Sequence, residues 1–265
     1  MSRWTALLVL CATLLATPVV HAGQETGFLD RTLSVNGVEY RYAIYVPRDW
    51  SPAKRWPVIL ALHGGGTYGT NGLWPTEGAL AKAIRIHPDR FPAIAVFPHG
   101  HADGMGWQGP NGDAALQEMN AAIEEFHGDP SRLYLTGFSA GGNGAWWLAF
   151  HHPDRFAAAL IVCGWVTRFT GRQSGVVYPP IATRASMDTY AAVAEGVGRL
   201  PVWLVHGDAD KTVSVEESRR MFAALKANGN DAHLIELPGI DHAAWDPAYQ
   251  NLDIATWLLA QRRPR

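Results

Sequence analysis

The sequence predicts a single α/β domain in which a mostly parallel sheet is covered by helices on both faces. Three observations predict it: strand-like runs that are apolar throughout, helical segments that alternate with them, and an opening pair of strands around a tight turn. A strand that is apolar on both sides is typical of a parallel sheet buried between two helical layers. Because 48% of the 265 residues are hydrophobic and 17% are charged, an intrinsically disordered chain is excluded.

The first predicted strands, 31–35 and 38–46, flank Asn36-Gly37, a dipeptide that favours hairpin turns. This hairpin adds an antiparallel edge to the sheet. Apolar runs predict further strands, and spacings of three and four between apolar residues predict helices. The predicted strands are 57–62, 93–97, 132–136, 156–162, 202–206 and 233–237, and the predicted helices are 78–87, 114–126, 141–150, 215–227 and 245–259. Since no linker or low-complexity tract interrupts 23–265, we expect one domain there.

Residues 1–22 have the pattern of a secretory signal peptide. Arg3 is their only charged residue, an apolar run spans 6–20, and a small-x-small exit ends at Ala22. The run is short for a membrane span, which needs about 20 apolar residues. We therefore expect cleavage after Ala22, a secreted or periplasmic mature chain and no stable membrane anchor. An uncleaved anchor and a lipoprotein attached through Cys11 are the alternatives.

The strongest chemical signal is the run 137–142, Gly-Phe-Ser-Ala-Gly-Gly, which directly follows a predicted buried strand and opens a predicted helix. This context is that of a nucleophile elbow, a turn so tight that the neighbours of its serine must be nearly free of side chains. Gly137, Ala140 and Gly141 meet that need. We therefore predict Ser139 as a nucleophile, against the alternative of a glycine-rich turn with an incidental serine.

A nucleophilic serine needs a histidine base and an acid that orients it, in the chain order serine, acid, histidine. Two aspartates follow the strand at 202–206, and we assign the acid to Asp210, because Asp208 is closer to the turn and better suited to shaping it. His242, in the loop before the last helix, is the predicted base. His206 ends a strand, so we expect it to have a structural role.

Acyl transfer also needs donors for the developing oxyanion. We assign the backbone amides of Ala140 and Gly65, with Gly66 as the alternative to Gly65 in the glycine run after an early strand. The loop of His99, His101 and Asp103 offers too few ligands for a metal site and is expected to line the mouth of the active site. We expect no metal and no organic cofactor.

Tryptophans fall in loops at the expected carboxyl edge of the sheet, where aromatic rings could stack on a sugar or an aromatic acyl group. The predicted substrate-binding residues are Trp74, Trp107, Trp165 and Trp245, with simple loop packing as the alternative. The segment 164–200 lies between two predicted strands and is expected to cap the pocket. Cys163 is the only cysteine after residue 22, and its apolar surroundings predict a buried, inert thiol.

With these residues in order, the chain resembles the α/β-hydrolase superfamily. The stretches 135–142, 153–158 and 239–249 are similar to those of secreted bacterial feruloyl and acetyl-xylan esterases and polyhydroxybutyrate-depolymerase-like proteins. They also resemble "predicted peptidase" proteins related to the prolyl oligopeptidase catalytic domain. The chain departs from some secreted depolymerases because it lacks a second cysteine for a disulfide in the mature part.

The resemblance and the predicted triad together imply a secreted serine hydrolase that cleaves carboxylic esters through an acyl-enzyme intermediate. Acetyl or feruloyl groups of plant polysaccharide are candidate targets, so the expected partner is a small-molecule or oligosaccharide ester. A net charge of −2 provides no basic field for nucleic acid. The alternatives are a serine peptidase of the prolyl oligopeptidase type and a non-catalytic binding protein that has kept the fold.

Overall fold

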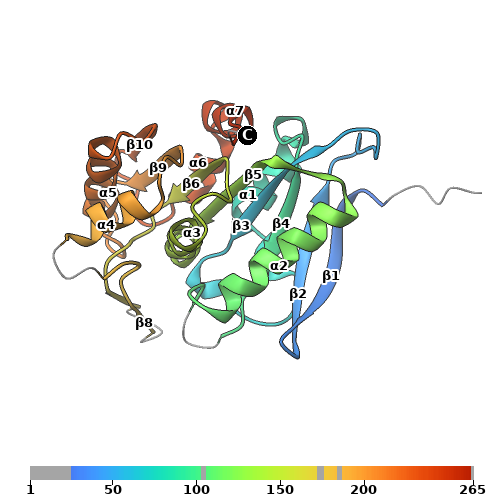
Figure 1. Ribbon diagram of the computed structural model, residues 1–265, viewed down its shortest axis with the longest axis horizontal. Helices are drawn as coiled ribbons and strands as arrows, with labels where there is room; N and C mark the ends of the chain where they lie inside the picture. Colours follow the sequence, from blue (N-terminus) through green and yellow to red (C-terminus); the bar gives the residue numbers. More distant parts are fainter. Residues whose placement is uncertain (1–24, 103–105, 172–175, 184–186, 264–265) are drawn as a thin grey trace, which may run out of the picture.

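The computed structural model describes residues 25–102, 106–171, 176–183 and 187–263 (Figure 1). The predicted signal peptide, 1–22, lies outside these residues. The described chain is built around one eight-stranded sheet. In spatial order its strands are β1 (Gly27–Val35), β2 (Val38–Val46), β4 (Ile94–Pro98), β3 (Trp56–Leu62), β5 (Gly128–Phe138), β6 (Ala158–Val162), β9 (Val202–Gly207) and β10 (Ala232–Leu237).

The sheet is parallel from β4 to β10, and the hairpin β1–β2 adds the antiparallel edge. The hairpin closes with Val35 opposite Val38. Asn36 and Gly37 both have positive φ, 52° and 80°, as a two-residue hairpin turn of type I′ requires. The predicted fold class, including this antiparallel edge, is confirmed.

Two helical layers cover the sheet (Figure 1). One layer contains α2 (Pro110–Glu125), α3 (Ala140–His151), α4 (Thr189–Gly196) and α5 (Glu216–Ala227), and the other contains α1 (Ala79–Ile86), α6 (Trp245–Gln250) and α7 (Leu252–Ala260). Successive strand side chains point to opposite faces, so β3 sends Leu60 into the first core and Ile59 into the second. This explains why β3, β4 and β6 are apolar at every position.

The predicted helix 245–259 is in fact two helices, because Asn251 interrupts it. Its backbone is extended, with φ −72° and ψ 118°, and its side chain accepts hydrogen bonds from the amides of Asp253 and Ile254. Asparagine is a preferred N-cap for this reason. The break turns α7 back over the second core, where Leu258 is buried.

The segment 164–200 forms a short hairpin, β7 (Phe169–Thr170) and β8 (Val177–Tyr178), before α4. Helix α4 packs into the first core through Tyr190 and Val193. Its role as a cap remains a prediction. Among the described residues, no helix combines the length and the apolar character that crossing a membrane would need.

Candidate active site

Ser139 lies between the end of β5 and the start of α3, with φ 54° and ψ −121°. A side-chain-bearing residue at positive φ is uncommon and marks a strained turn. The turn is closely packed on both sides: a Cβ on Gly137 would lie 2.2 Å from the Gly141 carbonyl oxygen, and one on Gly141 would lie 2.1 Å from that of Leu62. These distances confirm the steric argument for glycine on either side of the elbow.

The structure brings Ser139, His242 and Asp210 together although they are far apart in sequence. Nε2 of His242 lies 2.8 Å from Oγ of Ser139, and Nδ1 lies 2.7 Å from Oδ2 of Asp210. Because the carboxylate accepts a hydrogen bond from Nδ1–H, Nε2 is the unprotonated nitrogen of the neutral ring and accepts from the serine hydroxyl. This is the arrangement in which imidazole can take a proton from serine.

The loops that carry the acid and the histidine meet at Gly207, the last residue of β9. A Cβ there would lie 2.2 Å from the Ile240 carbonyl oxygen, so only glycine permits this approach. Asp208 accepts a hydrogen bond from the amide of Gly239 at 2.7 Å and thereby ties the two loops together. The structure therefore places Asp210, and not Asp208, against His242.

Asp210 is buried and its carboxylate is fully hydrogen-bonded. Oδ1 accepts from the amides of Thr212 and Val213 at 2.8 and 2.9 Å. Oδ2 faces two imidazoles, His242 and the buried His206, whose Nε2 lies 3.2 Å away. Burial favours the neutral acid, but hydrogen bonds from His206, His242 and the two amides outweigh it and lower the pKa of Asp210. The side chain is therefore an anion at neutral pH.

The amides assigned to the oxyanion lie beside the serine. A Cβ on Gly65 would be 3.6 Å from Cβ of Ala140, so the glycine loop and the start of α3 approach each other here. Among the described residues, neither amide has a hydrogen-bond acceptor in the protein. Gly66 lines the same cleft, and the choice between Gly65 and Gly66 stays open.

His63 holds the glycine loop in place. Its Nδ1 donates to the Gly64 carbonyl oxygen at 2.8 Å, and its Nε2 accepts from the Gly100 amide at 3.1 Å. Burial lowers the pKa of His63 to about 3, so the ring stays neutral and keeps one nitrogen as an acceptor. These contacts give His63 a structural role.

Ser139 and His242 open onto a cleft of about 450 Å³. Of the four predicted tryptophans, Trp74 and Trp245 line this cleft. The side chain of Trp74 is 55% exposed, whereas Trp245 packs its ring edge-on against His242 with centroids 5.9 Å apart.

The prediction was wrong for Trp107 and Trp165, which are buried and do not line the cleft. Trp107 fits against Gly144 of α3, where a Cβ would lie 2.2 Å from the tryptophan Cβ, and its indole donates to the His63 carbonyl oxygen. Trp165 packs on Phe169 with ring centroids 4.3 Å apart. Both rings therefore support the site from behind rather than contacting substrate.

Sequence reasoning missed Glu77, which lines the cleft with Trp74. The amide of Glu77 donates to the Trp74 carbonyl oxygen at 3.1 Å at the end of a 3₁₀ turn, and residues three apart in such a turn lie on one face. Among the described residues that line the cleft, Glu77 alone has a formal charge at neutral pH besides the titratable histidines.

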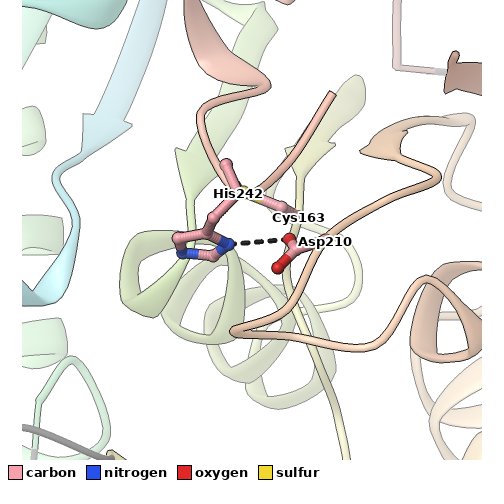
Figure 2. A group of neighbouring side chains, drawn as sticks. All are labelled: Cys163, Asp210 and His242. Carbon is pink, nitrogen blue, oxygen red and sulfur yellow. Dashed lines mark hydrogen bonds and ion pairs between the residues drawn. The ribbon is translucent and has the colours of Figure 1, made fainter. Parts of the chain in front are cut away.

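Figure 2 shows Cys163 beside Asp210 and His242; their possible ligand atoms lie within 4.8 Å of one another. The Cys163 thiol points to the His242 carbonyl oxygen at 3.5 Å, and burial raises its pKa well above the usual range. Because Asp210 and His242 already bond to each other, these donors are better described as a hydrogen-bonded cluster than as a metal centre. The thiol is buried, as predicted.

In the loop after β4, both ring nitrogens of His99 already have partners. His99 accepts from the Gly72 amide through Nδ1 and contacts the Thr67 carbonyl oxygen through Nε2, at 2.8 and 2.7 Å. The His101 ring stacks on Tyr40, and position 103 lies outside the described residues. Neither histidine lines the cleft, so the prediction that this loop forms its mouth was wrong for these two residues.

Residues 113–260, more than half of the chain, match the sequence model of the prolyl oligopeptidase family. The chain belongs to this family. It is 26% identical over 214 residues to the "Uncharacterized peptidase YuxL" of Bacillus subtilis, which covers 71% of this chain and 31% of that protein. It is 29% identical over 154 residues to the "Probable feruloyl esterase C" of Aspergillus terreus, covering 54% and 53%. The chain spans about a fifth to a third of the length of three curated relatives.

The fold is also that of solved α/β-hydrolases. A thermostable esterase superposes with a TM-score of 0.71 at 26% identity, covering 89% of this chain and 63% of the esterase. The match confirms the resemblance to α/β-hydrolase esterases that the elbow motif had indicated.

Proposed function

We propose that the chain is an exported serine hydrolase that cleaves carboxylic esters. The alignment of Ser139, His242 and Asp210 at an open cleft carries this proposal. Oγ of Ser139 attacks the ester carbonyl carbon while Nε2 of His242 takes the hydroxyl proton. Asp210 holds the imidazole through Nδ1 and stabilises its charged form.

The negative charge that develops on the carbonyl oxygen is stabilised by hydrogen bonds from the amides of Ala140 and Gly65. The carbon–oxygen bond to the alcohol then breaks, and His242 returns the proton to the departing alcohol oxygen. A water molecule repeats the attack on the acyl-enzyme with His242 again as base, which releases the acid and restores Ser139. Every proton transfer in this cycle goes through Nε2 of His242.

The cleft supports a small ester with an aromatic or sugar group as substrate, including acetyl or feruloyl esters of plant oligosaccharides. Trp74, Phe138 and Trp245 provide aromatic surface around the serine, and such surface binds flat rings and sugar faces. The esterase names of a sequence relative and of a structural neighbour favour the same reaction class. Export is inferred from the signal-peptide pattern of residues 1–22.

A serine peptidase is the second candidate, because the family description and one relative's name refer to peptidases. Paired assays with p-nitrophenyl acetate and peptide p-nitroanilides, each repeated with Ser139→Ala, distinguish the two. We expect serine-dependent turnover of the ester and slow or no cleavage of the anilides. Faster cleavage of an anilide would replace the esterase proposal with the peptidase. If a fluorophosphonate labels Ser139 but neither the ester nor the anilides are turned over, both the esterase and the peptidase proposals would be contradicted.

A further inference from the structure

The hydrogen-bonded chain of the site does not end at Asp210. His206, near the end of β9, is fully buried, and its Nε2 lies 3.2 Å from Oδ2 of Asp210 and 3.0 Å from the Val213 carbonyl oxygen. Its Nδ1 lies 2.7 Å from Oγ of Ser218 on α5. One continuous line of polar contacts therefore runs from the elbow through both histidines into the helical layer.

The protonation of His206 follows from its neighbours. A carboxylate and a carbonyl oxygen only accept hydrogen bonds, so Nε2 carries a proton; it donates to the Val213 carbonyl oxygen at 3.0 Å and lies 3.2 Å from Oδ2 of Asp210. In the neutral ring Nδ1 is then an acceptor, and the hydroxyl of Ser218, which is 3% exposed, donates to it. All polar atoms of this buried ring are thereby paired, as burial requires.

We propose that His206 is a positioning residue for the reaction proposed above: its Nε2–H group lies against the same oxygen of Asp210 that orients His242, and so fixes the carboxylate and stabilises its charge. Two N–H groups beside one oxygen each stabilise part of its negative charge. Without His206, that oxygen would attract the His242 proton more strongly and stabilise the imidazolium ion. The base would then be lost to protonation at a higher pH.

Three further titratable groups face this chain, and each keeps one state near neutral pH. Burial raises the pKa of Cys163 on β6, so the thiol stays neutral. Hydrogen bonds from backbone amides lower the pKa of Asp241, beside His242, and a hydrogen bond from Arg219 lowers that of Glu236 on β10. A change in the pH profile between pH 5 and 8 therefore does not come from these three groups.

Two substitutions separate donation from packing. His206→Phe keeps a ring of similar size but has no donor, whereas His206→Gln can place an amide N–H near the Nε2 position and an oxygen toward Ser218. Met221→Ala is the matched control, because Met221 is a buried core residue of α5 outside the chain of polar contacts. Ser218→Ala removes the hydroxyl that contacts Nδ1 of His206. It offers a milder variant if the ring substitution does not fold.

The measurement is the rate at which a small fluorophosphonate labels Ser139 as a function of pH. This rate needs the serine and its base but not the natural substrate. We expect His206→Phe to slow labelling at pH 8 by about ten- to a hundredfold, the range for losing a hydrogen bond to a charged group. We expect its acid-side midpoint to rise by about one pH unit, the usual spread of histidine environments. His206→Gln should recover most of the labelling rate at pH 8 and most of the midpoint shift. Ser218→Ala should shift the midpoint less but in the same direction.

An unchanged midpoint in folded His206→Phe or Ser218→Ala, or a profile for His206→Phe that matches Met221→Ala, would overturn the positioning role. Failure of the Gln variant to recover either quantity would also count against donation. If wild-type Ser139 is not labelled at any pH, the proposed serine chemistry itself fails. The two proposals are therefore tested separately in one experiment.

Discussion

Replacing Asp210 by asparagine tests the site sharply, because it keeps the size of the side chain but exchanges one acceptor oxygen for an NH₂ donor. Oδ1 accepts from the amides of Thr212 and Val213, so the new amide oxygen must occupy that position. Its NH₂ group then faces Nδ1 of His242 and Nε2 of His206, where an acceptor stood before. A donor in this place forces the His242 ring to accept through Nδ1.

When Nδ1 accepts, the ring proton moves to Nε2, which faces Oγ of Ser139 at 2.8 Å. Two donors then oppose each other, and His242 can no longer take the serine proton. The same exchange in a serine protease lowers kcat about 10⁴-fold, which corresponds to about 5 kcal/mol of activation free energy. We expect Asp210→Asn to lose activity on p-nitrophenyl acetate on this scale.

Asp208→Asn is the matched control, because Asp208 accepts from the Gly239 amide and makes no contact with His242. Its amide oxygen can keep that bond, so we expect activity within severalfold of wild type. The assay is kcat/KM at pH 8, with circular dichroism to show that both variants are folded. The argument fails if folded Asp210→Asn keeps more than a tenth of the activity, or if Asp208→Asn is the more damaging change.

Three further expectations concern the serine–histidine pair, a buried acid and the charge of the cleft. Ser139→Ala and His242→Ala should each lower ester kcat by around 10⁶, and the double variant should be little worse, because neither residue works without the other; additive losses in steady-state assays would contradict this. Glu118 on α2 is 1% exposed, its oxygens have no hydrogen-bond partner among the described residues, and burial raises its pKa well above the usual 4.5. Its stabilising contribution is thus present below pH 4.5 and is lost as pH rises through the raised pKa, so Glu118→Gln should unfold at a higher temperature than wild type at pH 9 but not at pH 4, and thermal unfolding at both pH values checks this. Glu77→Lys should raise kcat/KM for a carboxylate-bearing ester relative to a neutral one by about threefold to tenfold at low salt, and the gain should shrink in 0.5 M salt; a ratio that does not change would show that Glu77 is only solvated.

The parts of the site that sequence predicts are those fixed by local rules. The elbow at Ser139 is readable because its geometry excludes side chains at Gly137 and Gly141, and both positions are glycine. Asp210 and His242 are readable because each lies in the loop after a strand of the sheet, β9 and β10, and parallel strands deliver their following loops to one edge of the sheet. The Asn36-Gly37 hairpin is readable because its turn requires positive φ at both residues.

The parts that sequence does not predict depend on packing between distant segments. Trp107 occupies a loop position that could equally face solvent, and it is buried because Gly144 leaves space on α3. The spacing of Gly141 and Gly144 by three marks a side-chain-free face of that helix and was the available signal. His206 and Asp210 are four residues apart, but only the fold of the intervening turn brings them into contact.

The residues that line the cleft are only partly the residues that match the family, and this difference affects what can be inferred about substrate specificity. The residues matched by the family model, 113–260, include the serine, the acid and the histidine. The cleft wall is divided: Trp74 and Glu77 come from residues 64–79, before that match begins, whereas Phe138 and Trp245 lie inside it. Membership of a peptidase-named family therefore constrains how the carbonyl is attacked, but it says little about which leaving group is accepted. Since esters and amides share the same nucleophile and base, the choice between them has to be made on the alcohol or amine side of the cleft, where residues 64–79 supply the exposed indole of Trp74 and the carboxylate of Glu77.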